Sequence, residues 1–170
     1  LIMFTDKIEK VVMPKKGRMH VLRLLRELLY FEPEDTQTDL ALPLDYLNRI
    51  TKRKAIVFMV SDFMGAGYEK PMTVSARKHD LVPIVITDPR EEDMPNIGLV
   101  EFEDAETGQT IMVDTADNSL REAFGINVSK AQLQREKVFK RIGLDHIDIR
   151  LDKLYIDELT AFFRKRAARY

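Results

Sequence analysis

Two continuous apolar runs, with a helical stretch between them, constrain the fold of this chain more than any other feature. The runs Ala55–Val60 and Leu81–Thr87 are rich in β-branched side chains, and an aspartate stands close after each, at Asp62 and Asp88. An uninterrupted apolar strand indicates burial on both faces, as in the centre of a parallel sheet. The helical pattern around Pro71–His79 therefore predicts a crossover that joins two parallel strands.

The other segments extend this unit into an α/β domain, because apolar residues at helical spacing predict helices and short or alternating apolar stretches predict strands. The expected strands are Leu1–Thr5, Ile8–Met13 and His146–Leu151, and the expected helices are Arg18–Tyr30, Thr38–Ile50, Asn118–Arg141 (broken near Gly125) and Leu154–Ala168. Residues 98–114 predict an antiparallel hairpin with its turn at Glu106–Gly108. The predicted fold class is α/β: a Rossmann-like, open and mainly parallel sheet with helices on both faces, in a single domain over residues 1–170.

Composition excludes several classes of protein. The chain has 27 lysines and arginines against 28 aspartates and glutamates, so it lacks the basic excess of a nucleic-acid binder and we expect no nucleic-acid partner. No apolar run is long enough to span a membrane. The chain has no cysteine, which excludes disulfides and thiol catalysis and fits a reducing compartment, so we expect a cytoplasmic protein.

The first residues form an apolar run, Leu1–Thr5, that has the pattern of a core strand. Chain termini are usually polar and lie at the surface. The sequence therefore favours a fragment whose upstream residues have been removed.

Polar side chains stand where ligands bind in such sheets, beyond the carboxyl ends of the strands. They are Asp6, Thr38, Asp62 and Asp88. Carboxylate and hydroxyl oxygens are ligands that suit Mg²⁺ or Mn²⁺. Two structural interpretations compete with a metal site: Asp62 accepts backbone N–H bonds from the loop after its strand, and Thr38 is the N-cap of the helix that ends at Ile50.

Other patterns are less informative. Seven acidic residues lie between Arg90 and Glu106, and the segment from Glu91 to Glu106 is either a partner-binding face or a solvated hairpin and loop. The three histidines are far apart in sequence, and neither a G-x-S-x-G elbow nor a P-loop occurs.

Several stretches, taken in order, resemble one family. The matching pieces are Leu1–Asp6 with Gly17-Arg18, Thr38-Asp39-Leu40, Val60-Ser61-Asp62-Phe63, Asp88-Pro89-Arg90-Glu91 with Pro95 and Gly98, Asp104-Ala105-Glu106-Thr107-Gly108 and Val113-Asp114-Thr115. No single piece is specific, but the ordered set, which runs from the first residue to about Thr115, resembles the DUF58 family, a branch of the von Willebrand factor A-like proteins.

The resemblance implies a Rossmann-like sandwich that can carry a metal-ion-dependent adhesion site. In that site an Asp-x-Ser-x-Ser motif, a threonine and an aspartate hold a divalent cation; Thr38 matches the threonine and Asp62 the aspartate. The Asp-x-Ser-x-Ser motif is absent here, since it belongs to a strand before Leu1. The resemblance thus implies weak or no metal binding by this fragment, and Mg²⁺ or Mn²⁺ binding by the full-length parent.

Members of this family resemble partners of MoxR-type AAA+ ATPases, so the resemblance implies a non-enzymatic protein-interaction module. The alternative is a Mg²⁺-dependent phosphoryl-transfer or phosphoacceptor enzyme that uses Asp62 or Asp6. A third hypothesis is a structural module that binds through the acidic segment from Glu91 to Glu106.

The absent strand would lie between the strands that start at Leu1 and Ala55. Its loss would expose two rows of unpaired backbone groups. We therefore expect these two strands to close directly on each other, or another chain to fill the gap. If a second copy of this chain fills the gap, the protein forms a homo-oligomer through its exposed strand edges.

Overall fold

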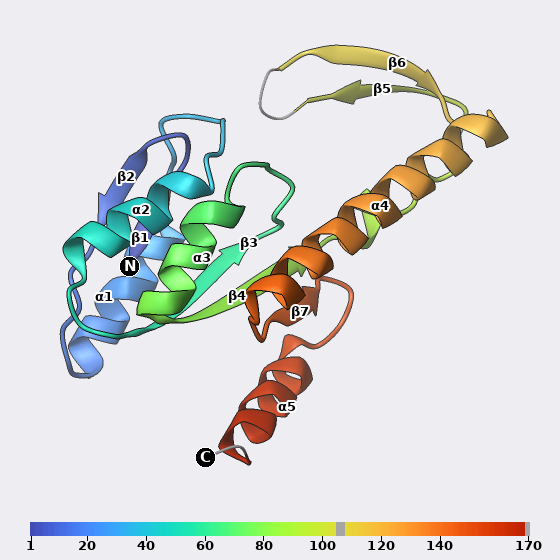
Figure 1. Ribbon diagram of the computed structural model, residues 1–170. Helices are drawn as coiled ribbons and strands as arrows, with labels where there is room; N and C mark the ends of the chain where they lie inside the picture. The colour runs from blue at the N-terminus through green and yellow to red at the C-terminus, as the bar shows by residue number, and fades with distance from the viewer. Residues whose placement is uncertain (105–107, 169–170) are drawn as a thin grey trace.

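The computed structural model of the chain describes residues 1–104 and 108–168, which form an α/β fold (Figure 1). The strands are β1 (Ile2–Phe4), β2 (Ile8–Val11), β3 (Ile56–Ser61), β4 (Asp80–Thr87), β5 (Leu99–Glu103), β6 (Thr110–Asp114) and β7 (Ile147–Arg150). The helices are α1 (Arg18–Leu29), α2 (Ala41–Ile50), α3 (Glu69–Lys78), α4 (Asn118–Ile142) and α5 (Tyr155–Ala167), with a 3₁₀ turn η1 (Pro89–Glu91). No helix in the described ranges is long and apolar enough to cross a membrane.

A three-stranded parallel sheet in the order β3-β4-β7 lies at the centre of the fold. Ile56 pairs with Asp80 and Ile84 pairs with Ile147, both in parallel register. Helix α3 joins β3 to β4, so the predicted crossover between two parallel strands is confirmed.

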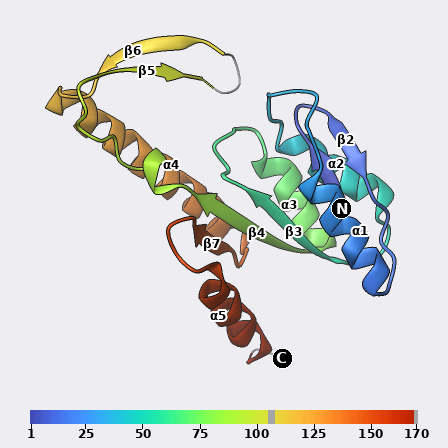
Figure 2. The same ribbon diagram turned by 180° about the vertical axis from the view of Figure 1, so that it is seen from behind.

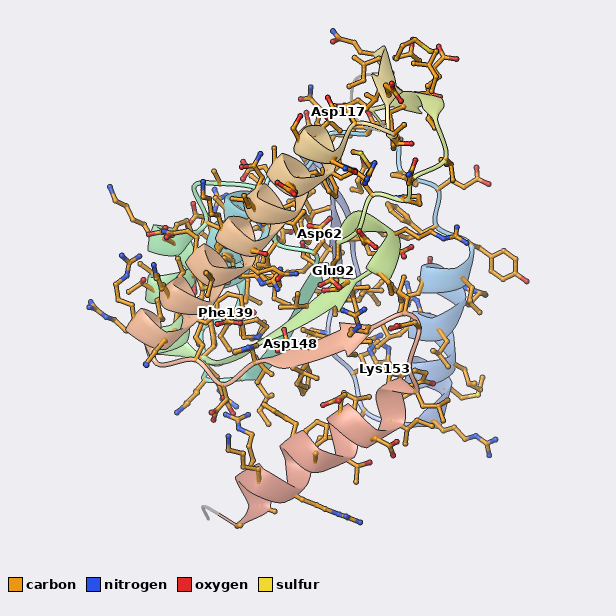
Figure 3. The ribbon with its side chains drawn as sticks, turned by 90° about the vertical axis from the view of Figure 1, so that its right-hand side faces the viewer. Asp62, Glu92, Asp117, Phe139, Asp148 and Lys153 are labelled. Atoms are coloured by element: carbon orange, nitrogen blue, oxygen red, sulfur yellow. The ribbon has the colours of Figure 1, made fainter. Side chains whose placement is uncertain are left out.

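Helices cover both faces of this sheet, as the sequence predicts. On one face α2, α3 and α4 pack a core in which Leu44, Met72 and Phe139 meet Met59 and Val85 of the strands. On the other face Phe162 of α5 packs against Val82 and Ile147. Helix α1 (blue, at the right of Figure 3) lies on the side of the sheet opposite α2 and α3.

The expectation that β3 is buried on both faces is wrong. Met59 faces the core and is buried, whereas Ile56, Phe58 and Val60 point to the other face and are exposed. The strand order explains the difference, because β3 stands at the edge of the sheet and the core around Phe162 involves only β4 and β7.

Strands β1 and β2 form a separate antiparallel ladder. The strands that begin at Leu1 and Ala55 therefore do not close on each other, and that expectation is wrong; a second chain between them stays a prediction. Helix α1 is joined to the ladder by an ion pair between Lys10 and Glu27, in which the nitrogen and oxygen are 2.5 Å apart. None of the residues of α1 is buried, although its apolar residues follow a helical stripe.

Within the described part of the chain, strands β5 and β6 pair only with each other, and they extend from the amino-terminal end of α4, away from the parallel sheet (Figures 1 and 2). The predicted hairpin is confirmed, while its turn at Glu106–Gly108 falls largely on residues 105–107, which lie outside the described residues. The predicted break near Gly125 is wrong, since α4 runs without interruption to Ile142. A single glycine costs a helix only about 1 kcal/mol, whereas Gly143, in the left-handed region at φ 79°, ends α4.

A buried polar cluster lies between α2 and α3. The Asn48 side-chain amide donates to Ser75 Oγ at 2.8 Å, and the Lys78 ammonium donates to the backbone carbonyl of Asn48. The His79 side chain is only 2% exposed, and neither ring nitrogen has a hydrogen-bond partner among the described residues. Burial, with a smaller effect from Lys78, lowers the pKa of His79 below its ordinary value.

This histidine makes the free energy of unfolding depend on pH. Because the pKa is lower in the folded state, the unfolded chain takes up a proton first as the pH falls through about 6.5. We expect His79→Phe to reduce the loss of unfolding free energy between pH 7 and pH 5, measured by urea unfolding. Profiles of wild type and variant that stay parallel over this range would contradict the assignment.

Candidate functional site

The four polar positions predicted from the sequence lie along one edge of the fold, where strands β1, β3 and β4 end. A backbone hydrogen bond joins two of the segments that carry these positions, since the Asp39 N–H donates to the Thr5 carbonyl at 3.0 Å. It ties the loop that carries Thr38 to the segment after β1, which carries Asp6. Asp6 is exposed.

The Thr38 loop also lies close to the loop after β3, because Leu40 and Phe63 are buried in the same core cluster. A Cβ placed on Gly65 would lie 3.5 Å from Leu40 Cδ1, which is ordinary van der Waals distance. Leu40 follows Thr38 closely in sequence, and Gly65 follows Asp62. Thr38 and Asp62 therefore lie on neighbouring loops, both at the upper side of Figure 1.

The Asp62 carboxylate organises its own loop. Asp62 Oδ1 accepts the Met64 N–H at 3.0 Å and lies 3.3 Å from the Ser61 hydroxyl, which donates to it. Between them Phe63 has a φ of 58°, a left-handed conformation that non-glycine residues seldom adopt. The structural interpretation of Asp62, a cap for the loop after its strand, is thus what these contacts show.

Thr38 is not the N-cap of α2, and this expectation is wrong. Helix α2 begins at Ala41, and Asp39 Oδ1 accepts the N–H groups of Ala41 and Leu42 at 2.8 and 3.3 Å. An aspartate carboxylate satisfies the free N–H groups of a first helical turn as well as a threonine hydroxyl does. Thr38 is left exposed on the loop.

A small cavity of about 40 Å³ lies beside Asp62, with room for a few water molecules. Its lining brings Asp62 together with Thr87 at the end of β4, Glu92 after η1, and Gln132 and Arg135 of α4. Figure 3 shows Asp62 and Glu92 in the space between α4 and the end of β4. Asp88, the fourth predicted position, caps η1 by accepting the Arg90 N–H at 2.9 Å.

Polar and charged side chains of α4 and β7 form hydrogen bonds and an ion pair around this cavity. Arg135 donates to the Asp62 carbonyl at 3.2 Å, and Gln132 donates to the Glu92 carboxylate at 2.6 Å. Arg150 forms an ion pair with the other Glu92 oxygen. The sequence analysis missed Gln132, Arg135 and Arg150, because none of them stands in a recognisable motif.

A histidine–carboxylate pair lies near Arg135. His146 Nε2 is 3.1 Å from Asp148 Oδ2. This hydrogen bond raises the pKa of His146 and lowers the pKa of Asp148, against the opposing effect of partial burial on each. The pair thus favours the charged forms of both side chains.

We call the edge formed by the Thr38 and Asp62 loops the rim. Its oxygen ligands suit a hard cation, although the set of ligands is small. The Thr38 hydroxyl and the Asp62 carboxylate are oxygen ligands of the kind that Mg²⁺ and Mn²⁺ take together with several waters. In the described part of the chain, no group of three or more His, Asp or Glu side chains is placed to hold a metal ion. Use of Asp62 or Asp6 as a phosphoacceptor stays a prediction.

Comparisons with known proteins point to uncharacterised relatives. The chain is 29% identical over 155 residues to an uncharacterized protein of Mycobacterium avium, an alignment that covers 89% of this chain and 91% of that protein. It is 26% identical over 155 residues to uncharacterized proteins of Mycobacterium bovis and Mycobacterium tuberculosis, again over 89% of this chain. The chain spans about half the length of these two relatives, since the alignment covers 49% of each.

No solved structure matches the chain. One family model, described as "Protein of unknown function DUF58", matches residues 1–135, which is most of the sequence. The match covers the β1–β2 ladder, β3, β4 and the rim that carries Thr38 and Asp62. The chain therefore belongs to the DUF58 family.

Proposed function

We propose that this chain is a non-enzymatic protein-interaction module that binds its partner at the rim carrying Thr38 and Asp62. The observation that carries the proposal is the burial of Leu40 and Phe63 in one core cluster, since these residues stand close to Thr38 and Asp62 in the chain. Ligands of open α/β sheets bind at this edge, beyond the carboxyl ends of the strands.

The chemistry of these two residues supports a divalent cation as part of the interaction. The Thr38 hydroxyl and the Asp62 carboxylate would hold Mg²⁺ or Mn²⁺ weakly, with water in the remaining positions. A cation held this way supplies an open coordination position for a carboxylate of the partner. Asp62 Oδ1 already accepts the Met64 N–H, so Oδ2 of the same carboxylate would be the ligand.

A MoxR-type AAA+ ATPase is the partner that the family resemblance suggests. This part of the proposal concerns the whole protein, because the chain matches only about half of the longer mycobacterial relatives. The module would act as a recognition surface, with the ATPase supplying the chemical energy.

The proposal predicts that Thr38→Ala with Asp62→Ala, made in the full-length parent, weakens binding to the purified ATPase at least about tenfold in Mg²⁺, which is the loss of roughly 1.4 kcal/mol. The expected loss follows from removal of both oxygen ligands. Surface plasmon resonance with and without a chelator measures it, and the chelator should have the same effect on wild type.

Thr110→Ala with Asp45→Ala makes the matched control. Both of these side chains are exposed, and neither lies on the rim loops. Binding in Mg²⁺ that is equal for wild type, the rim variant and the control would refute the assignment of Thr38 and Asp62. Absence of any binding by wild type would refute the partner.

A further inference from the structure

One face of helix α4 contacts the loop that carries Asp62 and the segment after β4. Gln132, Arg135 and Phe139 stand at helical spacing, so their side chains project from the same side of α4. Gln132 donates to Glu92 in the segment after β4. Arg135 and Phe139 both reach the loop after β3. Figure 3 shows Asp62, Glu92 and Phe139 along this helix, whose position therefore bears on the geometry of Asp62.

Arg135 contacts the backbone of Asp62 itself. One guanidinium nitrogen donates to the backbone carbonyl of Asp62 at 3.2 Å, although the two residues are 73 positions apart in the chain. Strand β3 ends at Ser61, so this carbonyl lies beyond the paired residues of the sheet. In the described part of the chain Arg135 forms no ion pair. Pairing with an acidic neighbour therefore does not account for its place beside Asp62.

The Asp62 carboxylate belongs to a tight turn. Its Oδ1 accepts the Met64 N–H at 3.0 Å, and the Ser61 hydroxyl oxygen accepts the Phe63 N–H at 3.1 Å. Phe63 has a φ of 58°, and a non-glycine residue keeps this conformation only where its surroundings hold it. The turn therefore depends on contacts from outside the loop.

Helix α4 supplies these contacts at two points. The Phe63 side chain is 4% exposed, and the centre of its ring is 5.3 Å from the centre of the Phe139 ring. The peptide group between Asp62 and Phe63 is bonded at both ends, because its N–H donates to Ser61 and its carbonyl accepts from Arg135. Rotation of this peptide group would change φ of Phe63 and break both bonds. Arg135 thus helps to fix the direction in which Asp62 points.

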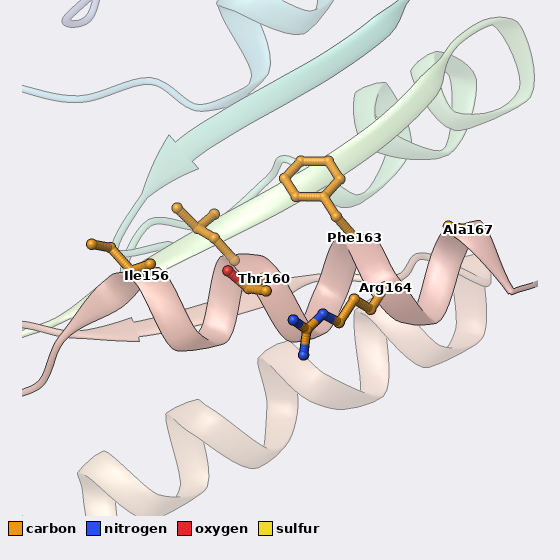
Figure 4. A pocket seen from close by; sticks show the side chains of 6 residues that line it. Ile156, Thr160, Phe163, Arg164 and Ala167 are labelled. Atoms are coloured by element: carbon orange, nitrogen blue, oxygen red, sulfur yellow. The ribbon is translucent and has the colours of Figure 1, made fainter.

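This network is separate from two other surfaces of the chain. The first is the outer edge of β3, where the sequence predicts an upstream strand; α4 packs over the inner side, against β4. The second is an open hollow of about 570 Å³ along α5, lined by Ile156, Thr160 and Phe163 among others (Figure 4). Helix α5 packs on the other face of the sheet. The contact between Arg135 and Asp62 therefore depends on neither surface.

We propose that Arg135 is a positioning residue for Asp62, which holds the peptide group between Asp62 and Phe63 so that Oδ2 of Asp62 stays turned to the rim. This inference rests on the proposed function, because Asp62 is the ligand there. Arg135 does not itself bind the cation. Its guanidinium is positively charged and opposes a nearby cation, so its favourable effect on cation binding comes from geometry alone.

Hydrogen exchange of the Met64 amide, measured by NMR in the full-length parent, reports on the turn directly. Arg135→Ala should speed this exchange at least about tenfold, because the Asp62 carbonyl loses its donor and the turn opens more often. Arg135→Lys should bring the rate back to within about threefold of wild type, since an ammonium group can donate the same single hydrogen bond. The urea midpoint of unfolding should stay close to that of wild type in both variants.

Binding of Mn²⁺ to the same variants of the full-length parent, measured by electron paramagnetic resonance, tests whether the positioning reaches the proposed ligand. Arg135→Ala should weaken Mn²⁺ binding at least about threefold, and Arg135→Lys should restore it. Removal of a positive charge by itself would strengthen the binding of a cation. The direction of the change therefore separates positioning from charge.

Lys137→Ala is the matched control, because it also removes one positive charge from α4. Lys137 is exposed and stands two positions from Arg135, so it projects from nearly the opposite side of the helix. This variant should leave both the Met64 exchange rate and the Mn²⁺ affinity unchanged.

Two results would overturn the inference. One is a Met64 exchange rate that Arg135→Ala leaves unchanged, and the other is Mn²⁺ binding that is equal or tighter in that variant. Failure of the proposed function gives a different result, in which the wild-type parent binds no Mn²⁺ or Asp62→Ala does not weaken its binding. The Met64 exchange rate then decides by itself whether Arg135 holds the turn. Circular dichroism verifies that each variant is folded.

Discussion

Replacing Phe139 with alanine is expected to lower the free energy of unfolding by about 3–5 kcal/mol, the usual loss for a large aromatic side chain in a core. Phe139 is 1% exposed and holds α4 against the sheet, in the cluster that contains Leu44 and Val85. Its ring meets the Phe63 ring edge to face, with centres 5.3 Å apart. Urea unfolding measures the loss.

The same substitution should also loosen the Asp62 loop. Phe63 keeps its left-handed backbone because its ring is fixed between Tyr68 and Phe139, and alanine at 139 removes one side of that packing. Hydrogen exchange of residues 61–67 should become faster. Phe102→Ala is the control, since Phe102 lies partly exposed on β5 and its loss should cost about 1 kcal/mol. Equal losses for the two variants would contradict the position of α4.

Replacing Thr115 with valine is expected to cost about 1–3 kcal/mol, because it leaves the Ile97 N–H without its hydrogen-bond partner. The Thr115 side chain is fully buried, accepts the Ile97 N–H at 3.0 Å and donates to the Gly98 carbonyl at 2.6 Å. Valine keeps the shape and removes both bonds. Urea unfolding and hydrogen exchange of β5 and β6 measure the effect.

These bonds fasten the base of the β5–β6 hairpin to the start of α4. Arg121 of α4 donates to the Thr115 carbonyl, so the same residue joins the hairpin and the helix. A two-stranded hairpin is marginally stable on its own, so exchange of its amides should rise by more than the loss of global stability alone accounts for. Thr110→Val, at an exposed position of β6, should leave both measurements within about 0.5 kcal/mol of wild type. Unchanged exchange in the Thr115 variant would refute this anchoring role.

Local pattern was sufficient for most of the secondary structure. The runs that predicted β3 and β4, and the apolar spacing that predicted α1 and α5, lie within two residues of the strands and helices found. Local pattern was insufficient where neighbours decide the outcome. The apolar run of β3 has the composition of a central strand, but its place at the sheet edge leaves Ile56 and Val60 exposed.

Local pattern likewise predicted some residues of the candidate site and not others. Thr38 and Asp62 were identified because they follow or precede recognisable elements, and the structure places their loops next to each other. Gln132 and Arg135 were not identified, since both come from α4 and meet Asp62 only through folding. The capping of α2 by Asp39 rather than Thr38 was decided by where the helix begins.

The sequence alone determined the α/β class, the parallel β3–β4 pair and the family, because side-chain periodicity and ordered motifs are properties of neighbouring residues. Only the tertiary structure decided which strand stands at the edge, which face of β3 stays open and which charges surround Asp62. Those features depend on contacts between segments far apart in the chain, and the free energies of such contacts are set by packing that no short stretch of sequence contains.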